Sequence, residues 1–130
     1  MAKKLAIMFG VVFVLVGVLG MISTPIAGPM GLFQTNSLHD YVHLLIGIVL
    51  LVVAFAAPAK SGLTLQIFGV VYFLLAILGF LLIPSGGDLL GLVTMNTADH
   101  VLHAVLGIVL FFAGKSAGSS SMASGMGNAM

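Results

Sequence analysis

Four long runs of apolar residues set the strongest limit on what this chain can fold into. The runs contain 17 to 21 residues each and are Leu5–Ile22, Tyr41–Ala57, Leu63–Ile83 and Ala98–Gly114. An α-helix rises about 1.5 Å per residue and the hydrocarbon core of a bilayer is roughly 30 Å thick, so each run can cross a membrane once its polar ends reach the interface. None shows the alternation of a β-barrel strand. The sequence therefore predicts an all-α membrane protein with four transmembrane helices.

The composition indicates that these helices lie in lipid, and it argues against nucleic-acid binding and against several kinds of catalytic site. Only 5% of the 130 residues are charged, whereas a soluble domain carries roughly 25%, so we expect the lipid bilayer to be the solvent for most of the chain. The net charge of +1 provides no field for binding nucleic acid. The chain also lacks an HExxH motif, a phosphate-binding loop and cysteine, and we therefore expect a protein that is not an enzyme.

The two halves of the chain resemble each other. Residues 9–25 align with residues 68–84, and residues 31–50 align with residues 91–110, with Pro, Asn and His in matching places. This pattern predicts two tandem parallel helical hairpins, one over about residues 5–57 and one over about residues 63–114. The two hairpins would form one transmembrane domain over residues 1–115. The Gly/Ser-rich residues 116–130 are predicted to form a disordered cytoplasmic tail.

The few charged residues predict an orientation. All lysines fall on one side of the predicted helices and all carboxylates on the other; they are Lys3, Lys4, Lys60 and Lys115 against Asp40, Asp88 and Asp99. Positive residues are enriched on the cytoplasmic side of membrane proteins. We therefore expect a multi-pass protein of the plasma (inner) membrane with both termini in the cytoplasm.

Two polar stretches, NSLHDYVH and NTADHVLH, begin the second and fourth helices. Asn36 and Asn96 start them and are suited to cap the free backbone N–H groups of the first turn. His43 and His103 lie seven residues further on, about 10 Å along the helix axis. An ionisable side chain at that depth usually faces the interior of a bundle. We therefore expect both rings to face the bundle, with the two helix ends side by side.

Three roles for these His and Asp side chains stay open at this point. They could tie two helices together by hydrogen bonds, they could bind a metal or a tetrapyrrole, or they could form part of a proton path. The metal ligands predicted first are His39, His43, Asp99 and His103, with Asp40 and His100 in second rank. Imidazole and carboxylate suit Zn, Cu or Fe. The absence of arginine disfavours haem, whose propionates need basic partners.

The sequence favours a non-enzymatic integral membrane protein that acts as an accessory or scaffold subunit beside other membrane proteins. A metal- or tetrapyrrole-binding membrane protein is the alternative.

The tandem motif resembles a known family. The pattern N-x-x-H-[DN]-x-x-H-L-x-x-G, followed by N-x-x-D-[NH]-x-x-H-x-x-x-G, is similar to that of small bacterial four-helix membrane proteins, catalogued only as a domain of unknown function. The resemblance covers roughly residues 5–113. The matching residues are Asn36, His39, His43, Asn96, Asp99 and His103. Asp40 and His100 stand where the pattern leads us to expect Asn. The resemblance implies the fold and the membrane location, and no activity or cofactor.

Overall fold

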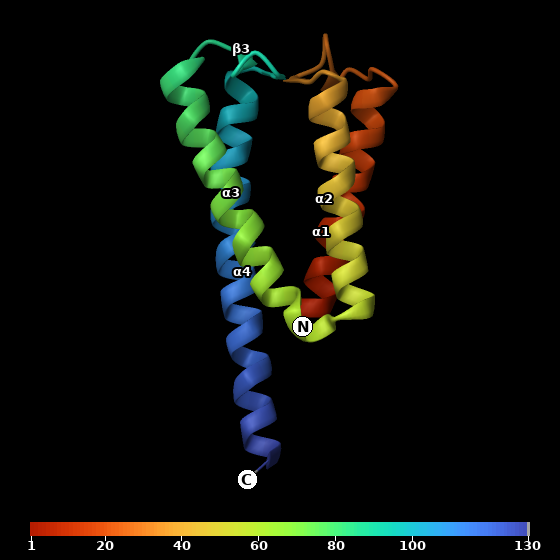
Figure 1. Ribbon diagram of the computed structural model, residues 1–130, viewed down its shortest axis with the longest axis vertical. Coiled ribbons are helices and arrows are strands. Elements are labelled where there is room, and N and C mark those ends of the chain that lie inside the picture. The colour runs from red at the N-terminus through yellow and green to blue at the C-terminus, as the bar shows by residue number, and fades with distance from the viewer. Residues whose placement is uncertain (130) are drawn as a thin grey trace.

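The computed structural model describes the backbone of residues 1–129 and the side chains of residues 1–117. Over residues 1–129 it contains four α-helices (Figure 1), which are α1 (Ala2–Met21), α2 (Ser37–Ala56), α3 (Ser61–Leu82) and α4 (Thr97–Ala129). Within the described residues, all four are long and apolar enough to span a bilayer. The chain is therefore an all-α, multi-pass membrane protein, as the apolar runs predict.

The helices pack as two antiparallel pairs. α1 lies chiefly against α2, and α3 lies chiefly against α4. Figure 1 shows the pairs side by side, joined by the short 3-10 helix η1 (Pro58–Lys60) between α2 and α3. We call α1 and α2 the first hairpin and α3 and α4 the second. The end of the bundle at η1 is the linker end, and the opposite end is the loop end.

Close backbone contact at glycine holds each hairpin together. A Cβ added to Gly47 would lie 2.7 Å from the carbonyl oxygen of Gly10, and one added to Gly107 would lie 2.8 Å from that of Gly69. Those distances leave no room for a side chain, so the helices approach as closely as their backbones allow. Such contact is a main source of helix association in lipid, where no hydrophobic force drives helices together.

The loop within each hairpin contains two short strands. β1 (Ala27–Gly28) and β2 (Phe33–Gln34) pair in parallel, whereas β3 (Gly87–Leu89) and β4 (Val93–Met95) pair antiparallel. Each loop also reaches across to the other hairpin, because β2 contacts α4 and β4 contacts α2. The two hairpins are thus joined at the loop end by their loops as well as at the linker end by η1.

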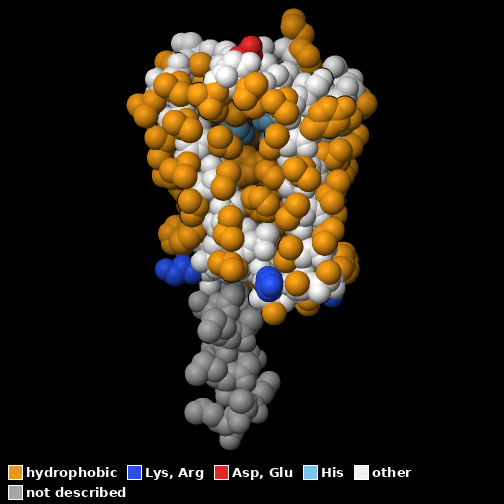
Figure 2. All heavy atoms as spheres, viewed as in Figure 1, with side chains coloured by type: hydrophobic (Ala, Val, Ile, Leu, Met, Phe, Trp, Pro, Cys, Tyr) orange, Lys and Arg blue, Asp and Glu red, His pale blue; other side chains and the backbone are white. Residues whose placement is uncertain are grey.

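Apolar side chains cover the sides of the bundle and polar ones lie inside it. Figure 2 shows hydrophobic side chains over the flanks, lysine side chains at the linker end and an acidic side chain at the loop end. The buried set includes apolar residues such as Leu50, Leu65 and Leu110, but also all four histidines. A bundle that exposes its apolar groups and buries its imidazoles is adapted to lipid.

The C-terminal helix is longer than the sequence predicts. α4 continues as helix to Ala129, past the apolar run that ends at Gly114, where the sequence predicts an irregular tail. The extension contains no proline, the residue that would break the helix. The side chains of the predicted tail after residue 117 are not among the described residues.

The duplication of the hairpin stays a prediction from the sequence.

Candidate metal centre

The two predicted capping residues begin α2 and α4. The side-chain oxygen of Asn36 accepts a hydrogen bond from the backbone N–H of His39 at 3.0 Å. Asn96 accepts one from the backbone N–H of Asp99 at the same distance. Each bond satisfies one of the N–H groups that have no partner within the helix. The caps therefore fix where both helices start, and with that the depth of every polar side chain that follows.

The same two asparagines also connect the hairpins. The amide nitrogen of Asn36 donates to the carbonyl oxygen of Leu92 at 2.9 Å, and that of Asn96 donates to the carbonyl oxygen of Leu32 at 2.8 Å. Each asparagine therefore caps its own helix with its oxygen and holds the opposite loop with its nitrogen. The sequence predicts the caps but not these crossed bonds, which hold the starts of α2 and α4 side by side.

Substitution of either asparagine separates its two roles. We expect Asn36→Ala to lower the free energy of unfolding by about 2 kcal/mol, since it loses both the cap and the crossed bond. Asn36→Asp keeps the acceptor for the cap and should lose only about 0.5–1 kcal/mol. Asn96 should give the same pair of values. Thermal unfolding in detergent micelles, followed by circular dichroism, measures both losses; an aspartate variant as stable as the wild type would show that the crossed bond contributes nothing.

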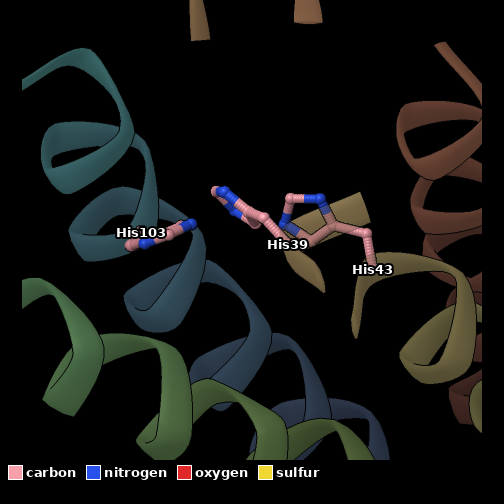
Figure 3. A group of neighbouring side chains, drawn as sticks. All are labelled: His39, His43 and His103. Atoms are coloured by element: carbon pink, nitrogen blue, oxygen red, sulfur yellow. The ribbon is translucent and has the colours of Figure 1, made fainter. Parts of the chain in front are cut away.

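Three histidines come together directly below the two capped ends. His39 and His43 lie one turn apart on α2, and His103 lies on α4. One ring nitrogen from each lies within 4.8 Å of the other two, and the rings are only 1% to 6% exposed. Figure 3 shows the three rings close together, and histidine side chains are visible between the hairpins in Figure 2. The structure thus brings together three of the four residues predicted first as metal ligands.

The hydrogen bond of His39 fixes the tautomer of its neutral ring. Its Nδ1 lies 2.8 Å from the carbonyl oxygen of Thr94 on β4. A carbonyl oxygen only accepts, so Nδ1 carries a proton, and in the neutral ring Nε2 has a free lone pair. Nε2 is buried and has no hydrogen-bond partner among the described side chains. Histidines that bind metals usually donate their second nitrogen to a carbonyl or carboxylate in this way.

The other two rings also have buried nitrogen atoms without partners. Nδ1 of His43 and Nδ1 of His103 form no hydrogen bond within the described part of the chain. Leaving such groups unpaired in an apolar interior costs several kcal/mol on hydrocarbon scales. Zn–N bonds measure about 2.0–2.1 Å, so the nitrogens of three histidines on one tetrahedral ion lie about 3.4 Å apart. The observed nitrogens lie within 4.8 Å of one another, so the rings would have to approach by up to about 1.4 Å to hold an ion, a shift that side-chain rotation can supply.

The structure places the remaining predicted ligands elsewhere. The carboxylate of Asp99 accepts the backbone N–H of Asn96 at 2.8 Å, which completes a capping box, so the prediction of Asp99 as a ligand does not fit this cluster. His100 bonds through Nε2 to the carbonyl oxygen of Ile83 at 2.8 Å, at the end of α3. Asp40 lies against Gly20 on α1. Both side chains therefore contact the first helix of their own hairpin.

Tyr72 is a residue of the site that the sequence analysis missed. Its ring centroid lies 5.1 Å from that of His103 and 6.3 Å from that of His43. The side chain is 1% exposed, and its hydroxyl has no hydrogen-bond partner among residues 1–117. The alignment of the two halves puts it opposite Phe13, and this exchange of Phe for Tyr deep in an apolar run was the signal available. Tyr72 closes the cluster on the side of α3.

Comparison with known proteins identifies the family of this chain but assigns it no activity. The family model described as Domain of unknown function (DUF4383) matches residues 3–115. No curated protein and no solved structure matches the chain. The match spans all four apolar segments, both capping asparagines and the three clustered histidines. The chain therefore belongs to the DUF4383 family.

Proposed function

We propose that this integral membrane protein binds one transition-metal ion through His39, His43 and His103. The observation that supports this most strongly is His39, whose Nδ1 is bonded to Thr94 while its unprotonated Nε2 is held without a partner beside the other two rings. A ring that served only to tie helices together would have no need to keep a free lone pair in a buried position. Three neutral imidazoles suit Zn, Cu, Fe or Ni.

A single ion fits this cluster better than a tetrapyrrole. The ring centroids of His39 and His43 lie 4.5 Å apart, and His39 lies 5.7 Å from His103. The rings of His43 and His103 lie 6.3 Å apart, so the three rings form a triangle and His39 lies directly beside the line that joins the other two (Figure 3). A macrocycle with His43 and His103 as axial ligands would need the space around that line to be empty.

The proposal keeps the protein non-enzymatic, as an accessory or scaffold subunit within a larger membrane assembly. The support is burial, because ligands that are 1% to 6% exposed leave a bound ion little access to a substrate. Three protein ligands leave a fourth coordination position, as catalytic zinc sites do, but at this depth of burial that position is closed to a substrate. A structural ion would hold the two hairpins together, since its ligands come from both.

Elemental analysis of gently purified protein tests the proposal. We expect about one metal ion per chain, retained through gel filtration. Apoprotein made with a chelator should take up one equivalent of Zn²⁺, Cu²⁺ or Ni²⁺. Protein that is isolated without metal and takes up none of these ions would disprove the assignment. A Soret band in the absorption spectrum would show that the protein binds a tetrapyrrole instead of a single ion.

We also propose that the loop end faces outward and that both termini are cytoplasmic. The support is the distribution of charge, with lysine at the linker end and acidic side chains at the loop end (Figure 2). The chain has no cysteine, so single-cysteine variants are labelled without background. In intact cells, an impermeant maleimide should label Met30→Cys and Leu92→Cys, both at exposed loop residues. It should not label Ala59→Cys until the cells are lysed; the reverse pattern would invert the orientation.

A further inference from the structure

A second polar cavity lies at the loop end, within the first hairpin and separate from the three histidines. It measures about 200 Å³. It is open on one side and lies between the end of α1 and the start of α2. Its polar or small lining residues are Gly20, Ser23, Asn36, Ser37, Asp40 and Tyr41. Neither the metal centre nor the caps account for this cavity.

Asp40 is the only ionisable carboxylate that lines the cavity. The side chain is 3% exposed, and its Oδ1 is buried without a hydrogen-bond partner in the described part of the chain. It lies directly against Gly20, where an added Cβ would overlap the carboxylate. The glycine thus provides the room in which the carboxylate sits. A buried carboxylate with an unpaired oxygen is costly unless a partner compensates it.

Among residues 1–117 no lysine near Asp40 supplies that partner, and the hydroxyl of Thr35, which interacts with the carboxylate, carries no charge. Lysine side chains lie at the linker end, opposite the cavity (Figure 2). Lys3 and Lys4 are in the first turn of α1, Lys60 ends η1, and Lys115 lies within α4, beyond its apolar run. His39, the adjacent imidazole, already donates its Nδ1 proton to Thr94. The second hairpin differs at the matching position, because His100 is bonded there to the carbonyl oxygen of Ile83. The first hairpin alone therefore presents a carboxylate that needs a positive charge from outside.

We propose that this cavity binds a primary ammonium group. One carboxylate balances one positive charge, and the hydroxyls of Ser23 and Ser37 offer acceptors for the remaining N–H groups. Liquid water occupies about 30 Å³ per molecule, so the cavity has room for an aminoethyl group. It opens where α2 leaves the apolar layer, beside Tyr41, which is 56% exposed. Both an aminophospholipid headgroup and a free amine carry this chemistry.

Native mass spectrometry of the full chain in micelles tests this binding with three probes: phosphatidylethanolamine, phosphatidylcholine and free ethanolamine. We expect retention of phosphatidylethanolamine about tenfold above phosphatidylcholine, whose quaternary nitrogen donates no hydrogen bond. Asp40→Asn, which keeps the shape of the side chain, should remove the preference. Asp88→Asn, at an exposed carboxylate of the same end whose Oδ1 accepts from Thr94, is the matched control and should keep it.

The three probes show both whether the site binds an amine and whether that amine belongs to a lipid or to a soluble molecule. Binding of free ethanolamine that depends on Asp40, without a preference between the two lipids, would support the site and assign it to a soluble amine. Equal retention of all probes by the wild type, or a preference that survives Asp40→Asn, would refute the site. The three histidines take no part in this test, so its result is independent of the metal centre.

Discussion

Replacing His43 by alanine should abolish retention of one metal ion per chain. A variant with two of three ligands loses a direct metal bond, and even changes to groups that only orient a ligand cost about 10–100-fold in affinity. We therefore expect more than about 100-fold weaker binding for His43→Ala, and the same for His39→Ala and His103→Ala. Isothermal titration with Zn²⁺ measures this loss. The stabilisation of about 2.7 kcal/mol that a ligand gives at 100 times its dissociation constant should disappear with it.

His100 is the matched control because it is the only other histidine in the chain. Its Nε2 lies 2.8 Å from the carbonyl oxygen of Ile83, and His100→Gln retains a donor for that carbonyl. This variant should bind the ion as tightly as the wild type does. If all four substitutions weakened binding equally, the ion would not be held by the cluster, and if none did, the cluster would be a structural hydrogen-bonding group.

Introducing valine at Gly69 should strongly destabilise the second hairpin. A Cβ at this position would lie 2.8 Å from the carbonyl oxygen of Gly107 and 2.9 Å from the Cα of Phe111. These are backbone atoms, which cannot move aside unless α3 and α4 separate. We expect a loss on the order of 3 kcal/mol, at the upper end of what overpacking costs.

Val71→Leu provides the comparison for Gly69→Val. It also enlarges an apolar residue of α3, but at a position that is 40% exposed on the surface of the bundle. Its stability should stay within about 0.5 kcal/mol of the wild type. Unfolding in sodium dodecyl sulfate titrations, followed by circular dichroism, compares the two. Equal effects of the two variants would mean that the close approach of α3 and α4 contributes little.

The four spans were predictable because lipid leaves a chain few alternatives. Every backbone polar group must be satisfied within the membrane, so a long apolar run has to be a helix. The starts of α2 and α4 were predictable too, since an asparagine before an apolar run has a specific chemical role there. The short strands of the two loops were not, because β1 and β2 contain two residues each and carry no period that a sequence displays.

The metal centre was predictable in part. The cost of facing lipid fixed the direction of His43 and His103, and both are buried. The sequence could not distinguish His39 from Asp99, which precede the inner histidines by the same four residues. A carboxylate at that position reaches back to the backbone of its own cap, as Asp99 does. An imidazole donates instead, and His39 finds its acceptor on Thr94 of the other hairpin, which only the folded structure reveals.

The crossed bonds of the asparagines also set an order of events during biosynthesis. Chains emerge from the ribosome with the N-terminus first, so α1 and α2 enter the membrane before α4 has been made. Until then Asn36 has no Leu92 to bond, and His39 and His43 have no third ring beside them. The cluster can form only after the start of α4 has been made and inserted. A protein with its histidines assembled is therefore one in which both hairpins have entered the membrane, and a chain truncated before α4 cannot assemble them.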